Sequence, residues 1–463
     1  MRHKQLTALL VAIIVVAAIV AAALLPPWRP ASSPLTLSHV QLLACPVGET
    51  GLGSTSVQVS DGKDFDTAVI TPPSSPSATP SPTDAQTSAD SPSQTPADTP
   101  SETPTATPTA SSTPAPSSVR VIDQPAATVV ARGSSMLGGV STYTQGGAVM
   151  MAPCTTPLSY GAWNGVDLSG DQVTLIVTNV DATPAVVDVF MYGEAGPITV
   201  PGLSDIPVAA GASQLLAINA LAQSDRPITV VVRASKGRVL GILRIIGQRG
   251  VDWQLPQTTP STDVVIPVVP SGDGIRTLSI TNSGTQTATV GVMILGETGS
   301  FPPLGLESVS VPSNDCLTVD ITSGFAGQAS AVHLQSDQPI TAAVVAGGAD
   351  LATVSGQPAL TGSLAFPGVG GTVWLANPSS QDAIVTIQSD DNGQQQTTTL
   401  QVPAQAIAGT DFPTGGRVVV MSDQAATLWA DLVVTSPSTS IVPLIAGGLP
   451  PAASVPSIAP GLG

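Results

Sequence analysis

The amino-acid sequence predicts an all-β protein, in which tandem immunoglobulin-like β-sandwich repeats follow one N-terminal transmembrane helix. Composition is the first reason: charged residues make up 10% of the chain and aromatic residues 3%, with 44 Gly and 44 Pro. Such a composition favours strands and turns over solvated helices. The other two reasons are a single long apolar run near the N-terminus and an alternating pattern that recurs three times. A length of 463 residues suggests several domains.

The apolar run covers residues 6–25 and contains no charged residue. As a helix it would reach about 30 Å, the hydrocarbon thickness of a bilayer. Arg2 and Lys4 precede it, and positive charge flanking a span marks its cytoplasmic side. We therefore expect a single-pass plasma-membrane protein whose residues after 25 are extracytoplasmic.

Two other interpretations of the N-terminus remain open. The small residues at 21–23 could end a cleaved signal peptide, which would make the protein secreted. The apolar run is longer than a usual signal peptide core, so an uncleaved anchor is favoured. Cys45 follows Leu-Leu-Ala, as in a lipid-attachment box, but it stands far from the apolar run, which disfavours lipidation.

Residues 71–118 consist mostly of Ser, Thr and Pro. A segment without apolar residues to bury is expected to be disordered, and its prolines favour an extended, semi-rigid chain. In an exported protein it is also a candidate for O-glycosylation. Strand-like sequences stand on both sides of it, so it interrupts a β unit.

The body of the chain repeats one pattern at Asn179, Asn282 and Asn377. Apolar residues alternate with polar ones before each Asn and again from six residues after it. This period-2 pattern around a short turn predicts a hairpin with one buried face. The asparagines are expected to be turn residues, because Asn tolerates a positive φ and bonds its own backbone. Ser-Asp segments at 224, 336 and 422 form a second recurring block.

Each repeat spans about a hundred residues, the size of an immunoglobulin-like sandwich. The predicted organisation is an anchor at 1–30, an N-terminal β segment at 31–148 that contains the 71–118 insert, and three sandwich repeats at 149–262, 263–361 and 362–463.

Three cysteines in an exported chain allow one internal disulfide. Cys45 and Cys154 are the expected pair, because each lies beside a proline at a strand-like end. Closing a loop of this length would stabilise the fold by about 4–5 kcal/mol in the chain-entropy model. Cys316 is expected to be a small packed residue.

The net charge of −17 argues against nucleic-acid binding, which needs a positive surface. One local cluster of bases could form a patch for an anionic polymer or for lipid headgroups. Its members are Arg226, Arg233, Lys236, Arg238, Arg244 and Arg249. The favoured interpretation is the solvent face of one hairpin that turns at residues 235–237.

The sequence carries no recognisable catalytic machinery. Its histidines are His3, His39 and His333, and no nucleophile elbow, P-loop, dinucleotide fingerprint or zinc-ligand spacing accompanies them. We therefore predict that the protein is not an enzyme and uses no cofactor or metal. Asp390 and Asp391, in a turn-like segment, are the best local site for a weak Ca²⁺ contact. A cryptic glycoside hydrolase would need a pair of carboxylates.

Aromatic side chains in loops are the candidates for carbohydrate contact. Tyr160, Trp163 and Trp253 stand in Gly- and Pro-rich surroundings, whereas Trp374 and Trp429 lie inside strand patterns and are expected in the core. The structural alternative for Trp163 is a plug that closes the first sandwich.

The chain resembles a family of exported actinobacterial proteins known as domain of unknown function 5719. The resemblance rests on the apolar N-terminus, the two cysteines beside prolines, GSSMLGG at 133–139, the approach from 163–165 to the first repeat motif, and the later Asn-centred motifs. It implies an envelope location and an all-β fold, and it brings no known activity.

The function expected from the sequence is that of a non-catalytic, membrane-anchored cell-envelope protein, a scaffold or interaction module with another envelope protein as partner. The alternative is a cell-wall polysaccharide-binding protein accessory to an envelope glycosyltransferase. A remote alternative is a cryptic glycoside hydrolase.

Overall fold

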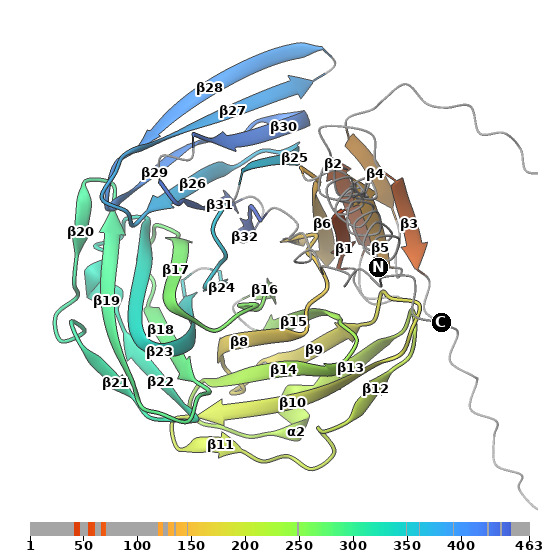
Figure 1. Ribbon diagram of the computed structural model, residues 1–463, viewed down its shortest axis with the longest axis vertical. Coiled ribbons are helices and arrows are strands. Elements are labelled where there is room, and N and C mark those ends of the chain that lie inside the picture. The colour runs from red at the N-terminus through yellow and green to blue at the C-terminus, as the bar shows by residue number, and fades with distance from the viewer. Residues whose placement is uncertain are drawn as a thin grey trace, which may run out of the picture. The chain divides into compact units, whose positions relative to one another are not determined.

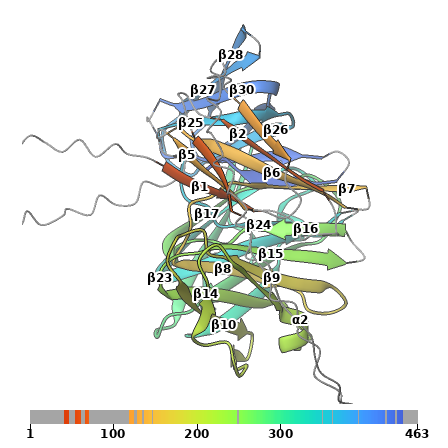
Figure 2. The same ribbon diagram turned by 90° about the vertical axis from the view of Figure 1, so that its right-hand side faces the viewer.

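The computed structural model describes the chain in thirteen stretches (Figures 1 and 2). They are residues 41–46, 54–60, 66–70, 119–123, 128–133, 136–145, 147–247, 250–348, 350–360, 362–391, 393–423, 426–435 and 438–445. The predicted anchor at 6–25 and the insert at 71–118 lie outside them. The chain divides into Met1–His39 and Val40–Gly463, and everything below belongs to the second part. In the described part, none of the helices combines the length and apolar composition that crossing a bilayer requires.

The regular secondary structure of the described chain is almost entirely β-strand, in four successive units. The N-terminal unit (41–153) contains β1 (Gln41–Cys45), β2 (Ser54–Ser60), β3 (Asp66–Ile70), β4 (Val119–Asp123), β5 (Thr128–Gly133), β6 (Gly138–Gln145) and β7 (Ala148–Pro153). Repeat 1 (160–254) contains β8 (Tyr160–Val166), β9 (Gln172–Thr178), β10 (Ala185–Gly193), β11 (Gly196–Ile198), β12 (Ile206–Val208), β13 (Ser213–Ala217), α2 (Ile218–Leu221), β14 (Ile228–Lys236), β15 (Leu240–Gly247) and β16 (Gly250–Gln254).

The two later repeats have the same succession of strands. Repeat 2 (261–355) contains β17 (Ser261–Val269), β18 (Arg276–Asn282), β19 (Ala288–Gly296), β20 (Gly299–Phe301), β21 (Val309–Val311), β22 (Asp315–Asp320), η1 (Thr322–Gly324), β23 (Ser330–Ala346) and β24 (Ala352–Ser355). Repeat 3 (363–443) contains β25 (Ser363–Val369), β26 (Thr372–Asn377), β27 (Ala383–Asp391), β28 (Gln394–Val402), β29 (Ala406–Asp411), β30 (Thr414–Ser422), β31 (Trp429–Val434) and β32 (Ser440–Pro443).

Each unit has two antiparallel sheets with one strand order. In the N-terminal unit, the first sheet is β1-β5-β3 and the second is β4-β2-β6-β7. In repeat 1, the first sheet is β8-β14-β10-β11 and the second is β13-β9-β15-β16. Repeat 2 follows the same order, except that the long β23 runs through both sheets. In repeat 3, β25, β30, β27 and β28 form one layer and β29, β26, β31 and β32 the other (Figure 1).

This order corrects part of the predicted fold class. In an immunoglobulin domain the first, second, fifth and fourth strands share one sheet. Here the second core strand β9 pairs with β13 and β15, while the first core strand β8 pairs with β14. The prediction of all-β sandwich units is confirmed, and the immunoglobulin-like topology is wrong. The physical reason is that alternation along a strand records which face is buried and not which neighbour the strand has.

The N-terminal segment is a fourth unit of this kind. Its sheets repeat the strand order of repeat 1, although it lacks the Asn-centred pattern that marks the other three. Two of the expected unit boundaries fall inside strands. Position 149 falls inside β7, which pairs with β6, and position 263 falls inside β17.

The Asn-centred segments are arches between sheets and not hairpins. β9 pairs within the second sheet of repeat 1, and β10, which follows the turn, pairs within the first. Both strands point alternate side chains into the same core, which includes Leu175, Val177, Val187 and Val189. A hairpin and an arch therefore have the same period-2 signature.

The three asparagines hold these arches in one way. Asn282 is fully buried, and its Nδ2 donates to Gln286 O at 2.7 Å and to Val311 O at 3.1 Å. Its Oδ1 accepts from Gly284 N at 3.0 Å. Asn179 and Asn377 make the corresponding three bonds. Their structural role was predicted correctly, although none of the three has a positive φ.

The four units contact one another in cyclic order. The first sheet of each unit packs against the second sheet of the next through apolar side chains. These contacts are Ala44 with Val180 and Leu240, Ala162 and Val231 with Cys316, and Val265 with Ala376 and Val433. Repeat 3 returns to the N-terminal unit, where Val140 joins the core of repeat 3 and Ala365 N donates to Met136 O. Stacking of this kind covers sheet faces that single sandwiches leave exposed.

The last strands of the units form a second set of contacts, again in cyclic order. β7 contacts β16, β16 contacts β24, β24 contacts β32, and β32 contacts β7. Val149 N donates to Ser438 Oγ at 2.9 Å, and Thr439 N donates to Asp350 Oδ2 at 2.6 Å. Thr353 N donates to Asp252 Oδ2 at 3.0 Å. Trp253 and Tyr143 close the cycle with stacked rings whose centroids are 5.3 Å apart. Side chains from different units therefore interlock.

Candidate functional site

Two of the three aromatic residues predicted to contact glycan, Trp163 and Trp253, are core residues. Trp163 is fully buried, its Nε1 donates to Gln254 O at 3.0 Å, and a Cβ at Gly241 would lie 2.7 Å from its ring. Trp253 is 3% exposed and stacks on Tyr143. The exposed-platform interpretation of these two residues is wrong, because their ring faces pack against protein. Trp163 does plug repeat 1, the alternative interpretation of its pattern.

Tyr160 is half-buried where repeats 1 and 2 meet, and it packs against the apolar cluster that contains Cys316. The Arg233 guanidinium lies 5.8 Å from its ring centroid and 5.0 Å from that of Phe190. Burial raises the pKa of Tyr160 to about 12, against the opposing effects of Ser283 and Arg233. Tyr160 therefore stays uncharged at neutral pH.

The two cysteines expected to pair do form a disulfide, between β1 and the residue that follows β7. It joins the two ends of the N-terminal unit across the 71–118 insert. Cys316 is buried against repeat 1, where its Sγ lies 3.4 Å from Ser279 Oγ. It is a packing residue, as its surroundings in the sequence suggested.

The basic residues of repeat 1 do not form one face. β14 and β15 belong to different sheets, so the predicted hairpin is wrong. Arg226 pairs with Glu194 at 3.3 Å, Arg238 pairs with Asp181 at 2.9 Å, and Arg244 is buried. Arg249 lies outside the described residues.

Asp390 and Asp391 end β27, at the turn of the hairpin that β27 forms with β28. Asp390 Oδ1 accepts from Gly393 N at 3.1 Å, as expected of a β-turn. Among the described residues no group of three or more His, Cys, Asp or Glu side chains is arranged to hold a metal ion.

A cavity of about 480 Å³ lies beside the Gly-rich loop that precedes β18. The buried Arg276 guanidinium, which lines it, donates to Gly274 O at 2.6 Å, Pro270 O at 2.9 Å and Gly272 O at 3.1 Å. Asp350 is likewise committed to backbone N–H groups. Arg276 and Asp350 hold loops at this cavity, which makes it the weaker candidate for a ligand.

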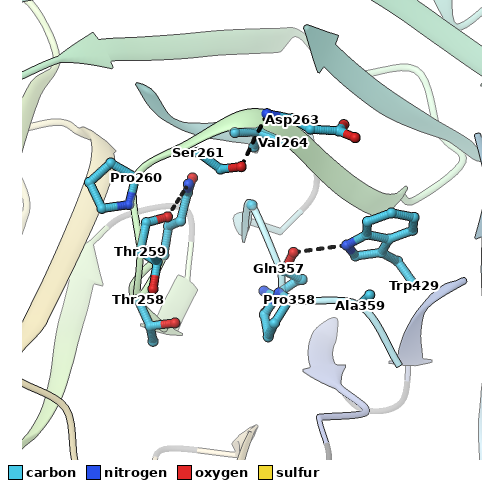
Figure 3. Close-up of a pocket in the computed structure, with 12 residues that line it drawn as sticks. Thr258, Thr259, Pro260, Ser261, Asp263, Val264, Gln357, Pro358, Ala359 and Trp429 are labelled. Atoms are coloured by element: carbon cyan, nitrogen blue, oxygen red, sulfur yellow. Dashed lines mark hydrogen bonds between the residues drawn. The ribbon is translucent and has the colours of Figure 1, made fainter. Parts of the chain in front are cut away.

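A second cavity, of about 270 Å³, is the better candidate (Figure 3). It lies where the segment that joins repeats 1 and 2 meets the segment that joins repeats 2 and 3, with β31 of repeat 3 as a third wall. Its lining residues are Gln257, Thr258, Thr259, Pro260, Ser261, Asp263, Val264, Gly356, Gln357, Pro358, Ala359 and Trp429.

Hydrogen bonds fix the frame of this cavity. Gln257 Nε2 donates to Thr259 O at 2.8 Å, and Gln257 Oε1 accepts from Ala342 N at 2.9 Å. Trp429 Nε1 donates to Gln357 O at 2.9 Å, which holds the indole of repeat 3 against the linker (Figure 3). The walls are therefore formed before any ligand arrives.

The lining combines an indole and two prolines with hydroxyls, two side-chain amides and a carboxylate. Asp263 Oδ1 lies 2.6 Å from His333 Nε2, which orients the carboxylate at the cavity edge. Apolar walls with a few fixed polar groups are typical of sites for small molecules. Sequence reasoning missed this site because its residues come from two linkers and a distant strand, and it assigned Trp429 to the core only.

Fold and cavity together define an all-β protein of interlocked sandwich units, with a polar cavity at a junction of repeats. Residues 109–404 match a family of unknown function (DUF5719), so the chain belongs to that family. A comparison with curated proteins finds no match.

Proposed function

We propose that this protein is a non-catalytic, membrane-anchored scaffold or interaction module of the cell envelope. The observation that carries the proposal is the interlocking of the four units by side chains from neighbouring units, such as Asp350 with Thr439. Units joined in this way move together, which suits a body that presents fixed surfaces to a partner. The Cys45–Cys154 disulfide supports an extracytoplasmic location, because disulfides persist in oxidising compartments.

Labelling in intact cells tests the location. Ser310→Cys places a thiol on an exposed strand, and Gln5→Cys places one before the apolar run. A membrane-impermeant maleimide should label the first variant in intact cells and the second only after lysis. Recovery of the chain in carbonate-washed membranes distinguishes an anchor from a cleaved signal. Labelling of both thiols only after lysis would contradict the proposal.

The cavity in Figure 3 favours a second candidate function, binding of cell-wall polysaccharide. Hydroxyl, amide and carboxylate groups beside an indole match the alternating polar and apolar faces of a sugar ring. Glycoside hydrolysis would need two carboxylates, and Asp263 is the carboxylate that lines this cavity, so binding without cleavage is proposed.

Retention of the full chain on purified wall polysaccharide tests this second function. Gln357→Ala and Asp263→Asn should each reduce retention, because they remove groups that line the cavity without touching the cores. Gln214→Ala, at a half-buried side chain of β13 in repeat 1, is the matched control. Retention that both cavity variants leave unchanged would exclude the cavity as the glycan site.

A further inference from the structure

The edge of the first sheet in repeat 3 differs from the corresponding edge in the other two repeats. In repeat 1 the edge is divided between β11 and β12, which contain Pro197 and Pro207. In repeat 2 it is divided between β20 and β21, with prolines at 302 and 303 between them. Short strands and prolines are the usual protection against pairing with another chain. Repeat 3 instead has the continuous strand β28.

β28 has one strand neighbour in the described part of the chain. All nine residues, Gln394–Val402, pair with β27, and no strand of the described residues pairs with the opposite edge. Figure 2 shows β28 beyond β27 at the outside of this sheet. Its outer backbone N–H and C=O groups are therefore available to a further strand.

Side-chain hydrogen bonds and core packing hold β28 in its extended conformation. Gln401 Nε2 donates to Asp382 Oδ2 at 3.0 Å, and Ala404 N donates to Asp382 Oδ1 at 2.9 Å, which fixes the end of β28 against β27. Val402 belongs to the core of repeat 3, with Leu400 packed beside it. A strand already ordered in this way loses little conformational entropy when it binds another.

The sequence of β28, QQQTTTLQV, decides which partner it suits. It contains no charged residue, although the whole chain has a net charge of −17. A basic partner would find no acidic side chain on this strand. Gln and Thr side chains both donate and accept hydrogen bonds, so each is complementary to another copy of itself. Like charges facing each other would oppose such pairing, and β28 has none.

We infer that β28 pairs with β28 of a second copy of this chain, antiparallel and centred on Thr398. In this register Thr397 lies opposite the second copy's Thr399, and Gln395 lies opposite the second copy's Gln401. These four side chains are all exposed in the single chain. The pairing continues the first sheet of repeat 3 across a two-fold axis, the symmetry of most homodimers.

The area that one strand pair buries is small, so the pairing is weak in dilute solution. The membrane anchoring proposed above would raise the effective concentration of chains, but the pairing itself does not depend on it. Nor does it depend on the cavity in Figure 3, which lies in other strands.

Disulfide cross-linking of the purified full chain tests the inference. Thr398→Cys places a thiol at the centre, where facing residues are close enough for a disulfide. Mild oxidation should give a covalent dimer that reductant reverses, in several-fold higher yield than from Ser310→Cys. Ser310 is exposed on β21, the corresponding edge of repeat 2, and serves as the matched control.

A charge variant supplies the second measurement. Adding Thr397→Lys and Thr399→Lys to Thr398→Cys should lower the dimer yield several-fold, whereas Thr397→Ser and Thr399→Ser should preserve it. Equal thermal unfolding of the variants shows that they are folded. A dimer yield from Thr398→Cys no higher than from Ser310→Cys, or one that the lysines leave unchanged, overturns the inference. Failure of the maleimide or polysaccharide experiments would leave it standing.

Discussion

The carboxylate of Asp252 in repeat 1 accepts a hydrogen bond from the backbone N–H of Thr353 in repeat 2, at 3.0 Å. The side chain is buried, and its burial raises its pKa from 3.8 to about 7, with the nearby Asp350 adding to the rise. An acid group that joins two units therefore titrates near neutral pH.

Stability should fall as the pH rises from 3.8 to about 7 through this group. In that range the folded chain keeps a proton that the unfolded chain has lost, so folding is favoured most at the acid end. The loss at pH 7 amounts to at most about 4 kcal/mol. Thermal unfolding of the full chain at several pH values should show a shallower decline for Asp252→Asn than for the unsubstituted chain. Identical slopes would mean that Asp252 is not the titrating group.

Asp431 should lower the free energy of unfolding at pH 8. It is fully buried on β31, neither of its carboxylate oxygens has a hydrogen-bond partner in the described structure, and burial raises its pKa well above 3.8. Replacing an unpaired buried acid by an apolar side chain of similar size removes the desolvation cost. Asp431→Leu should raise the free energy of unfolding by about 1–3 kcal/mol. Asp411→Leu, at an exposed side chain of β29, is the control, and equal effects of both would contradict the prediction.

Asn282→Ala should destabilise the protein by about 3 kcal/mol, because it leaves two carbonyl groups and one N–H without their partner. Denaturant unfolding measures the loss. Gln286→Ala, at an exposed side chain of the same arch, should change stability by less than about 0.5 kcal/mol. A small effect of Asn282→Ala would show that water replaces the amide in the arch.

Reduction of the Cys45–Cys154 disulfide should weaken the N-terminal unit. The two cysteines are 109 residues apart, and the chain-entropy model assigns such a loop about 4–5 kcal/mol. The double variant Cys45→Ala/Cys154→Ala should unfold at lower denaturant concentration than the oxidised chain and should no longer respond to reductant. Cys316→Ala should keep the response to reductant, because Cys316 takes no part in the disulfide.

Much of the fold could be predicted from local pattern. The alternation around Asn179, Asn282 and Asn377 reflects one buried face per strand, and the structure has these strands. Pairing partners could not be predicted, because an arch and a hairpin bury the same alternate residues. For the same reason β14 and β15 looked like one hairpin although they lie in separate sheets.

The site depended on contacts that local pattern does not record. Trp163 and Trp253 stand among Gly and Pro and looked exposed, but neighbouring units and loops cover them. Trp429 stands inside a strand pattern and does pack between repeats, yet one edge of its ring lines the cavity with residues more than 160 positions earlier in the chain.

By itself, the sequence determined the all-β class, the repeating unit, the choice of cysteine pair and the structural role of the repeated asparagines. These properties follow from residue types and their spacing, because the burial of alternate residues and the bonding capacity of Asn are local. Only the tertiary structure decided the strand order, the presence of a fourth unit, the cyclic stacking and the place of the cavity. Each of these depends on which sheet faces meet, and that choice is made by the summed packing of residues distant in the chain.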